Sequence, residues 1–241
     1  MIWALAITAA ILIFSGQSPF IVKDLDKYVK THVVDKAKQD KIIVLLKDSK
    51  DARKDVVKLD KEHLKDLDKL LQARDSKPND YNVLLEEILA SQAKSQKANI
   101  AVMQEAQNDI TAEEWVAIHV DIEASLKKSD KDRLKHLEEV EKYYKKWKTK
   151  VGKTIADKEK SKQAISIIEK NKELFIGNYK KAQAELMNPQ SVMYKYKASE
   201  TELVELRTKI IDLIKEVYKS SVDAHFELIK LTTEEEWKKI N

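Results

Sequence analysis

The chain contains no cysteine and only three glycines and three prolines among its 241 residues. Without cysteine there can be no disulfide bond, no thiol catalysis and no cysteine-ligated metal site. Sandwiches, barrels and nucleotide-binding folds need glycine or proline at turn after turn, so this composition excludes them as classes. The remainder is 43% apolar and 36% charged, which is typical of long helices joined by few turns.

An excess of one charge is also missing. The 45 lysines and arginines are interleaved with 41 aspartates and glutamates, which leaves a formal net charge of +4. The arginines are Arg53, Arg74, Arg133 and Arg207. Sequence-specific nucleic-acid binding depends on arginine and on clustered basic faces. We therefore expect a solvated, lysine-rich surface and no nucleic-acid partner.

The first 22 residues differ from the rest, because residues 2–22 carry no charge and residues 2–14 are strongly apolar. The apolar run fits a signal peptide, and the whole stretch is long enough for a membrane anchor, which needs about 20 residues. We expect this segment to direct the chain to a periplasmic or cell-surface location, and to hold it at the membrane if it is not cleaved. Two alternatives stay open. The first is a membrane anchor after which the chain faces the cytoplasm, which Lys23 and Lys27 favour. The second is a buried core helix.

Apolar residues in steps of three and four predict one long helix from Leu25 to Leu70. The stretch DSKPND, residues 75–80, ends this helix, since Pro78 cannot continue it and its neighbours favour turns. One face of the following helix is completed by apolar and small side chains: Tyr81, Leu84, Ile88, Ser91, Ser95, Ala98 and Val102. The short connection predicts an antiparallel hairpin.

The motif T-x-E-E-W-x-x-I occurs twice, at residues 111–118 and 233–240. In each copy the threonine is a good N-cap, and the glutamate three residues later completes a capping box. The tryptophan is the first large apolar group of the new helix and anchors it. The predicted structural caps and anchors are Thr111, Glu114, Trp115, Thr233, Glu236 and Trp237.

The two tryptophans lie 122 residues apart, and the same offset places Asp35 on Asp157 and Ile43 on Ile165. A constant offset that also preserves the apolar stripe predicts a tandem duplication. The predicted organisation is a signal peptide or membrane anchor at 1–22 and helical hairpin repeat 1 at 23–119. A helical bridge with the start of the second long helix follows at 120–147, and helical hairpin repeat 2 occupies 148–241.

The repeat predicts a second long helix that begins near residue 130, with Ser129 as its N-cap, and continues to Met187. Its inner face comprises Leu134, Leu137, Val140, Tyr144, Trp147, Val151 and Ile155. Pro189 breaks this helix, and Ser199 with Glu202 caps the returning one. The predicted fold is all-α: elongated antiparallel helical hairpins in a coiled-coil-like bundle.

Catalytic and metal-binding patterns are scarce. The histidines are His32, His63, His119, His136 and His225, and they form no H-E-x-x-H or H-x-x-x-H pair. Asp60 and His63 supply one acid-x-x-His pair, but the 122-residue offset gives no second pair for a di-iron carboxylate bundle. We expect no catalytic residues, no cofactor and no metal, and a carboxylate-bundle metalloenzyme is the least favoured alternative.

These features predict a non-catalytic, exported or membrane-tethered helical protein that serves as a protein-interaction or spacer module. Its expected partner is another protein, and oligomers of the chain itself are compatible with the long seams. The closing Leu231 and Thr232 are loosely similar to the start of the paired Leu-Thr-x-x-Gln motif of a periplasmic metal- and envelope-stress family, although the glutamine is missing from both copies. That resemblance implies an alternative, a periplasmic helical stress sensor or chaperone-like protein.

Overall fold

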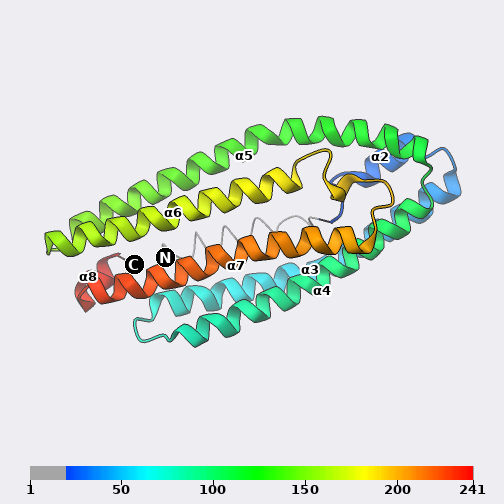
Figure 1. The fold of residues 1–241 in the computed structure, drawn as a ribbon. Helices are drawn as coiled ribbons and strands as arrows, with labels where there is room; N and C mark the ends of the chain where they lie inside the picture. The colour runs from blue at the N-terminus through cyan, green and yellow to red at the C-terminus, as the bar shows by residue number, and fades with distance from the viewer. Residues whose placement is uncertain (1–19, 241) are drawn as a thin grey trace.

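The computed structural model describes residues 20–240, except for the side chains of residues 130 and 131. These residues form an elongated bundle of helices with no strand among them (Figure 1). The helices are α2 (Leu25–His32), α3 (Lys36–Gln72), α4 (Pro78–Asn108), α5 (Ala112–Thr154), α6 (Lys158–Leu186), α7 (Glu200–Leu231) and α8 (Glu234–Ile240), with the short 3-10 helix η1 (Val192–Tyr194) before α7. The all-α class predicted from the scarcity of turn residues is confirmed.

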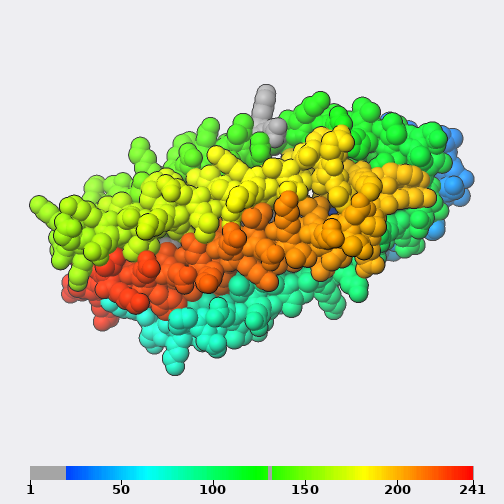
Figure 2. Space-filling model, viewed as in Figure 1, coloured from blue at the N-terminus to red at the C-terminus, as the bar shows by residue number. Residues whose placement is uncertain are grey.

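The helices α3 and α4 form one antiparallel hairpin, and α6 and α7 form another (Figure 1). Within the first, the Ser49 hydroxyl donates to Oδ1 of Asn99 at 3.2 Å. Within the second, Nδ2 of Asn171 donates to the hydroxyl of Ser221 at 3.1 Å. The predicted antiparallel hairpins are therefore confirmed, and α6 and α7 lie side by side along the rod in Figure 2.

The uninterrupted helix predicted from Leu25 to Leu70 is wrong, because α2 and α3 are separate helices. Asp35 causes the break: its carboxylate accepts hydrogen bonds from the backbone amides two and three residues later, at 2.9 and 3.1 Å, as an N-cap does. Val33 leaves α2 in an extended conformation but remains buried. The next buried residues after Val33 are Gln39 and Ile42, out of phase with the buried face of α2, so the apolar periodicity is interrupted at the break.

The helix start predicted at Ser129 is also wrong, since α5 runs without interruption from Ala112 to Thr154. Inside it, the Ser129 hydroxyl donates to the carbonyl of Ser125 at 3.0 Å, a bond typical of serine within a helix. The second long helix instead breaks between α5 and α6, well before Met187. The predicted bridge at 120–147 is thus the middle of one helix of 43 residues, about 65 Å long. The division into two repeats stays a prediction.

Some residues predicted for the inner faces point outward, as the 54% exposure of Leu134 shows. On α4, Ala98 is exposed and the buried positions are Gln92 and Gln96 rather than the neighbouring serines. The prediction followed apolarity, whereas a seam follows the geometry of the helix and can pass through polar residues.

The apolar core is concentrated toward the two ends of the rod. The cluster that includes α8 contains Trp147, Val151, Ile168, Tyr218, Leu228 and Trp237. The cluster that includes α2 contains Leu25, Val29, Ile42, Met103, Trp115 and Ile118. A third, smaller cluster lies along α6 and α7. The core therefore secures both ends of the bundle.

Residues 1–19 of the predicted signal peptide or membrane anchor lie outside the described residues. The end of that segment is described, and Phe20 and Val22 are 3% and 4% exposed within the core. The packed bundle thus includes residues before the predicted boundary at residue 22. In the described part of the chain, no helix combines the length and the apolar character required to cross a membrane.

Candidate functional site

Both copies of the T-x-E-E-W motif lie at the start of a helix. Thr111 precedes α5 and Thr233 precedes α8, and each hydroxyl accepts the backbone amide of its glutamate at 3.2 Å. The carboxylates of Glu114 and Glu236 accept the threonine amides in return, at 2.9 and 2.8 Å. Each motif is therefore a reciprocal capping box that satisfies two backbone donors at a helix end.

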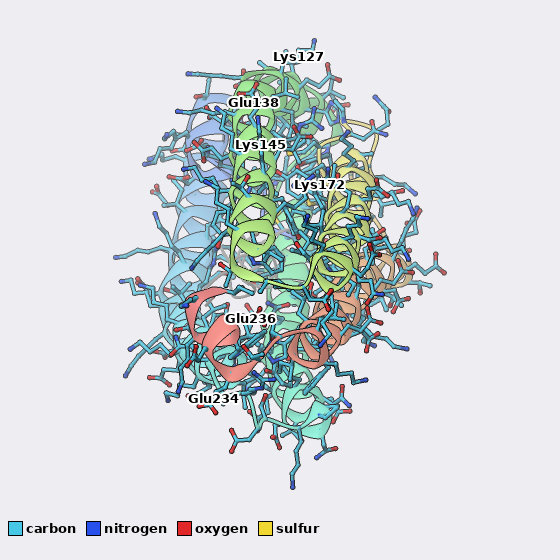
Figure 3. All side chains as sticks on the ribbon, turned by 90° about the vertical axis from the view of Figure 1, so that its left-hand side faces the viewer. Lys127, Glu138, Lys145, Lys172, Glu234 and Glu236 are labelled. Atoms are coloured by element: carbon cyan, nitrogen blue, oxygen red, sulfur yellow. The ribbon has the colours of Figure 1, made fainter. Side chains whose placement is uncertain are left out.

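The same glutamates also reach across to a break in another helix. Oε1 of Glu114 accepts the backbone amide of Val34, between α2 and α3, at 2.9 Å. Oε1 of Glu236 accepts the backbone amide of Ala156, between α5 and α6, at 2.8 Å. An amide in such a break has lost its helical acceptor, and the carboxylate replaces it. Each capping box thus fastens a break between two other helices, and we call each such fastened break a joint. Figure 3 shows Glu236 of α8 at one end of the bundle.

The two joints repeat each other at the 122-residue offset. Val33 (φ −82°, ψ 116°) and Ile155 (φ −77°, ψ 114°) have nearly the same backbone conformation. Asp157 accepts the amides two and three residues later, as Asp35 does. The first residues of α3 and α6, of α4 and α7, and of α5 and α8 are also 122 apart. Repeated joint geometry is thus a property of the fold, while its origin by tandem duplication stays a prediction.

The joints depend on ionised carboxylates. At Glu114, burial favours the neutral acid, but the donating amides of Thr111 and Val34 outweigh it, and the net effect lowers the pKa. At Glu236, the amides of Thr233 and Ala156 are the main cause of a lowered pKa. Hydrogen bonds donated to a carboxylate stabilise its charged form. The amides of each joint therefore keep its glutamate ionised.

The two anchoring tryptophans are equally buried, at 3% exposure each, but their contacts differ. The indole Nε1 of Trp115 donates to the carbonyl of Tyr194 at 3.0 Å. The indole nitrogen of Trp237 has no hydrogen-bond partner in the described part of the chain. Its ring instead meets that of His225 edge to face, with centroids 5.1 Å apart. One tryptophan is thus held by a hydrogen bond, and the other by ring packing alone.

The turn of each hairpin covers the joint that belongs to the other half. From the connection between α6 and α7, the Tyr196 hydroxyl donates to the carbonyl of Ile110 at 2.7 Å, next to the α5 capping box. From the turn between α3 and α4, Arg74 donates to the carbonyl of Ile229 at 3.1 Å and also to that of Thr232. The two halves are therefore interlocked rather than placed end to end.

A buried imidazole lies beneath α8. The Tyr81 hydroxyl donates its only hydrogen to the carbonyl of Leu70 at 2.7 Å, and it lies 3.0 Å from Nε2 of His225. Nε2 of His225 must therefore carry the hydrogen and donate it. His225 is 0% exposed, and burial lowers its pKa to about 4. Burial also raises the pKa of Tyr81 to about 12. Both groups are neutral over the physiological range.

A polar seam lines the inner face of the α3–α4 hairpin. The polar side chains buried there are Asp60, His63, Gln92, Gln96 and Asn99, each no more than 8% exposed. Both amide atoms of Gln92 and Oε1 of Gln96 have no hydrogen-bond partner in the described residues. Each such group costs about 1–3 kcal/mol unless water or another ligand satisfies it. No three His, Asp or Glu side chains of the described residues are grouped as a metal site would require.

Sequence reasoning missed both interior features. Asp60 and His63 were noted as an acid-x-x-His pair, but Gln92 and Gln96 were passed over, although they follow Ile88 at steps of four. His225 was noted only as one of five scattered histidines, although it lies three residues before Leu228 on the apolar face of α7. In each case a polar residue in phase with an apolar stripe was the available signal.

Comparisons of the chain with protein-family models, with curated proteins and with solved structures find no match. The joints, the polar seam and the imidazole under α8 are accordingly interpreted from their own geometry.

Proposed function

We propose that the protein is a non-catalytic helical module that serves as a stiff spacer and presents one helix face to a protein partner. Stiffness is supported by the two joints, since each breaks a helix but fastens the break with a capping box from elsewhere in the bundle. It is also supported by the interlocked turns, which tie each half to the other. A spacer must resist bending, and these contacts oppose it at both ends.

The observation that carries the interaction role is an apolar stripe on the outside of α5. Val116, Val120 and Leu134 are 66%, 64% and 54% exposed. Their spacings of 4 and 14 residues place them on one side of the helix. Single exposed apolar residues are normal on protein surfaces, but three on one side of one helix offer apolar contacts to a partner helix.

Charged residues share this side of α5: Lys127 lies between Val120 and Leu134, and Glu138 and Lys145 follow Leu134. Lys127, Glu138 and Lys145 are exposed and follow one another along α5 in Figure 3. We expect the partner to offer a helical segment with apolar side chains facing the valines and charges opposite to these three. Such charges fix the register and the choice of partner more than they raise affinity.

The test uses a photoreactive residue at one position of the full chain, expressed in the cells that naturally produce it. The probe p-benzoylphenylalanine replaces Val120 or Leu134, and replaces Val83 of α4, 49% exposed, as the matched control. We expect a discrete cross-linked protein from both α5 positions, absent from the control and weakened by Lys127→Glu. Equal cross-linking from all three positions, or none from α5, would contradict the proposed surface.

Export or membrane tethering is part of the same proposal and is supported by the uncharged residues 2–19. Cell fractionation followed by N-terminal sequencing of the recovered protein tests it. A protein recovered outside the cytoplasm or with the membrane agrees with the proposal. A cytoplasmic, soluble protein with an intact N-terminus contradicts this part, while the α5 cross-links test the interaction role separately.

A further inference from the structure

The positive charge of the chain is concentrated at one end of the rod. Residues 142–172, which form the end of α5 and the first half of α6, contain eleven lysines against three acidic residues. This is an excess of eight positive charges in a chain whose formal net charge is +4, so the rest of the chain is net acidic. Figure 3 looks onto this end of the rod, with Lys145 of α5 and Lys172 of α6 labelled.

The three acidic residues of this segment are already engaged. Asp157 caps α6 by accepting two backbone amides. The carboxylate of Glu159 lies 2.9 Å from the ammonium group of Lys162. Glu169 pairs with Lys148 of α5 and with a second lysine of α6. The other lysines at the end of α5 therefore receive no counter-charge from this segment.

Four of these lysines form one outward side of α5, which we call the lysine face: Lys142, Lys146, Lys150 and Lys153. All four are exposed, and within the described part of the chain none of them makes an ion pair. Their spacings of four, four and three residues place them on one side of the helix over about 17 Å. This side points away from the buried Tyr144 and Trp147. It lies about a quarter turn around α5 from the stripe of Val116, Val120 and Leu134, so it is a separate surface.

The lysine face has no group that reads a base or stacks on one. The neighbouring rings of Tyr144 and Trp147 are 2% and 3% exposed, and no arginine lies within residues 142–172. Single-stranded nucleic acids bind to exposed rings, and base readout relies on arginine. The face also has no apolar side chain, since the other exposed residue on this side is Thr149. A partner helix, in contrast, needs an apolar strip between its charges.

We propose that the lysine face docks on a membrane surface rich in anionic phospholipids. Each ammonium group is a compact charge that binds phosphate without a fixed geometry. Clusters of about four to eight basic residues on an amphipathic helix are typical of such docking. Because the lysine face runs along α5, docking places the long axis of the rod along the bilayer surface. This contact requires neither the N-terminal anchor nor the helical partner proposed above.

The outward side of α3 provides a matched comparison, which we call the α3 face. It carries four exposed lysines, and its first and last lysines are eleven residues apart, as on the lysine face: Lys54, Lys58, Lys61 and Lys65. Four exposed acidic residues share the same turns: Asp51, Asp55, Glu62 and Asp66. Lys54, for example, lies 2.7 Å from Asp51. The charges of the α3 face are therefore balanced, and we expect it to have no affinity for an anionic surface.

A local reporter on the full chain tests the proposal. The chain has no cysteine, so Thr149→Cys or Lys61→Cys accepts a single fluorophore on the lysine face or on the α3 face. We expect vesicles of phosphatidylcholine mixed with phosphatidylglycerol to shield the label at position 149, but not the label at position 61, from a soluble quencher. Vesicles of phosphatidylcholine alone should shield neither label, and the shielding should weaken as NaCl is raised.

Glutamine variants measure the contribution of the charges. Each lysine near an anionic surface contributes about fivefold to binding. Glutamine at all four positions of the lysine face should therefore weaken vesicle binding, measured by the label at position 149, by at least about fiftyfold. Glutamine at the four lysines of the α3 face should change binding by less than about threefold. All eight side chains are exposed, so circular dichroism should show that both variants are folded.

Three results would overturn the proposal: equal shielding at positions 149 and 61, equal shielding by neutral and anionic vesicles, or an equal loss of binding in the two glutamine variants. Soluble polyanions test the source of the phosphate. If inorganic polyphosphate or duplex DNA shields position 149 as strongly as the anionic vesicles do, the lysine face is a general polyanion site and the membrane proposal is wrong. The signal is local to the lysine face, so it is independent of the α5 cross-links and of the fractionation result.

Discussion

The two hairpins are closed by joints with the same hydrogen bonds, yet they bury different side chains midway along the rod. The α3–α4 hairpin buries Gln92 with its amide unpaired, whereas the equivalent position of the α6–α7 hairpin is Ile214, 2% exposed. Asp60, 3% exposed, likewise corresponds to Ala182, 0% exposed. The joints share their hydrogen bonds because each must satisfy a backbone amide that has lost its helical acceptor. A seam has only to fill space, so different side chains can line the two hairpins.

The largest expected effect concerns the anchors of the two joints. Trp115→Ala and Trp237→Ala should each lower the free energy of unfolding by about 3–5 kcal/mol, since each deletes a large buried side chain. The milder tryptophan-to-phenylalanine variants should show a difference in stability between the two joints. Trp115→Phe leaves the Tyr194 carbonyl without its donor and should cost about 1 kcal/mol more than Trp237→Phe, which removes no such bond.

Urea denaturation of the four tryptophan variants, followed by circular dichroism, measures these differences. The alanine variants serve as the reference, because they remove the ring from both joints. Equal losses in the two phenylalanine variants would mean that the hydrogen bond to Tyr194 contributes nothing net, and that the joints are energetically alike.

The second expected effect concerns the seam. Ile214→Gln places an amide in an apolar environment and should cost about 2–4 kcal/mol. The reciprocal Gln92→Ile removes an unpaired buried amide and should stabilise the protein by about 1–2 kcal/mol. Thermal unfolding of both variants, compared with the wild type, shows whether each substitution lowers or raises the stability. If Gln92→Ile destabilises the protein, the Gln92 amide has a hydrogen-bond partner such as bound water. The buried polar groups of the first hairpin would then not be unpaired.

Much of this fold could be predicted from the sequence. Scarce glycine and proline indicated long helices, the turn around Pro78 indicated the first hairpin, and the T-x-E-E-W motif marked the starts of α5 and α8. These features are local, because a cap or a turn is determined by a few adjacent residues.

The remaining features depend on contacts between distant residues. Nothing near Glu114 indicates that its second partner is the amide of Val34, 80 positions away. The breaks before α3 and α6 do shift the phase of the buried positions, from Val33 to Ile42 and from Ile155 to Ala164, but the contacts that hold them come from distant residues. The pairing of Tyr81 with His225, 144 positions apart, likewise follows only from the packing of α4 against α7.

The smallest expected effect tests how closely the joints match. Glu114→Ala and Glu236→Ala each remove the acceptor for two backbone amides, and each should cost about 1–2 kcal/mol. The neighbours Glu113 and Glu235 are exposed on the same turns and serve as matched controls, for which alanine should cost less than about 0.5 kcal/mol.

The contribution of these carboxylates should also depend on pH in a defined direction. The pKa values of Glu114 and Glu236 are lowered in the folded protein, so the stability they contribute is present above the ordinary glutamate value of 4.5 and is lost as the pH falls through the folded values. Urea midpoints measured from pH 7 to pH 3 should therefore converge for wild type and both alanine variants at the acid end. If the difference in urea midpoint between the wild type and the alanine variants stays constant from pH 7 to pH 3, packing rather than charge holds the joints. If the urea midpoint of only one alanine variant differs from that of the wild type, the two joints differ in strength although their hydrogen bonds match.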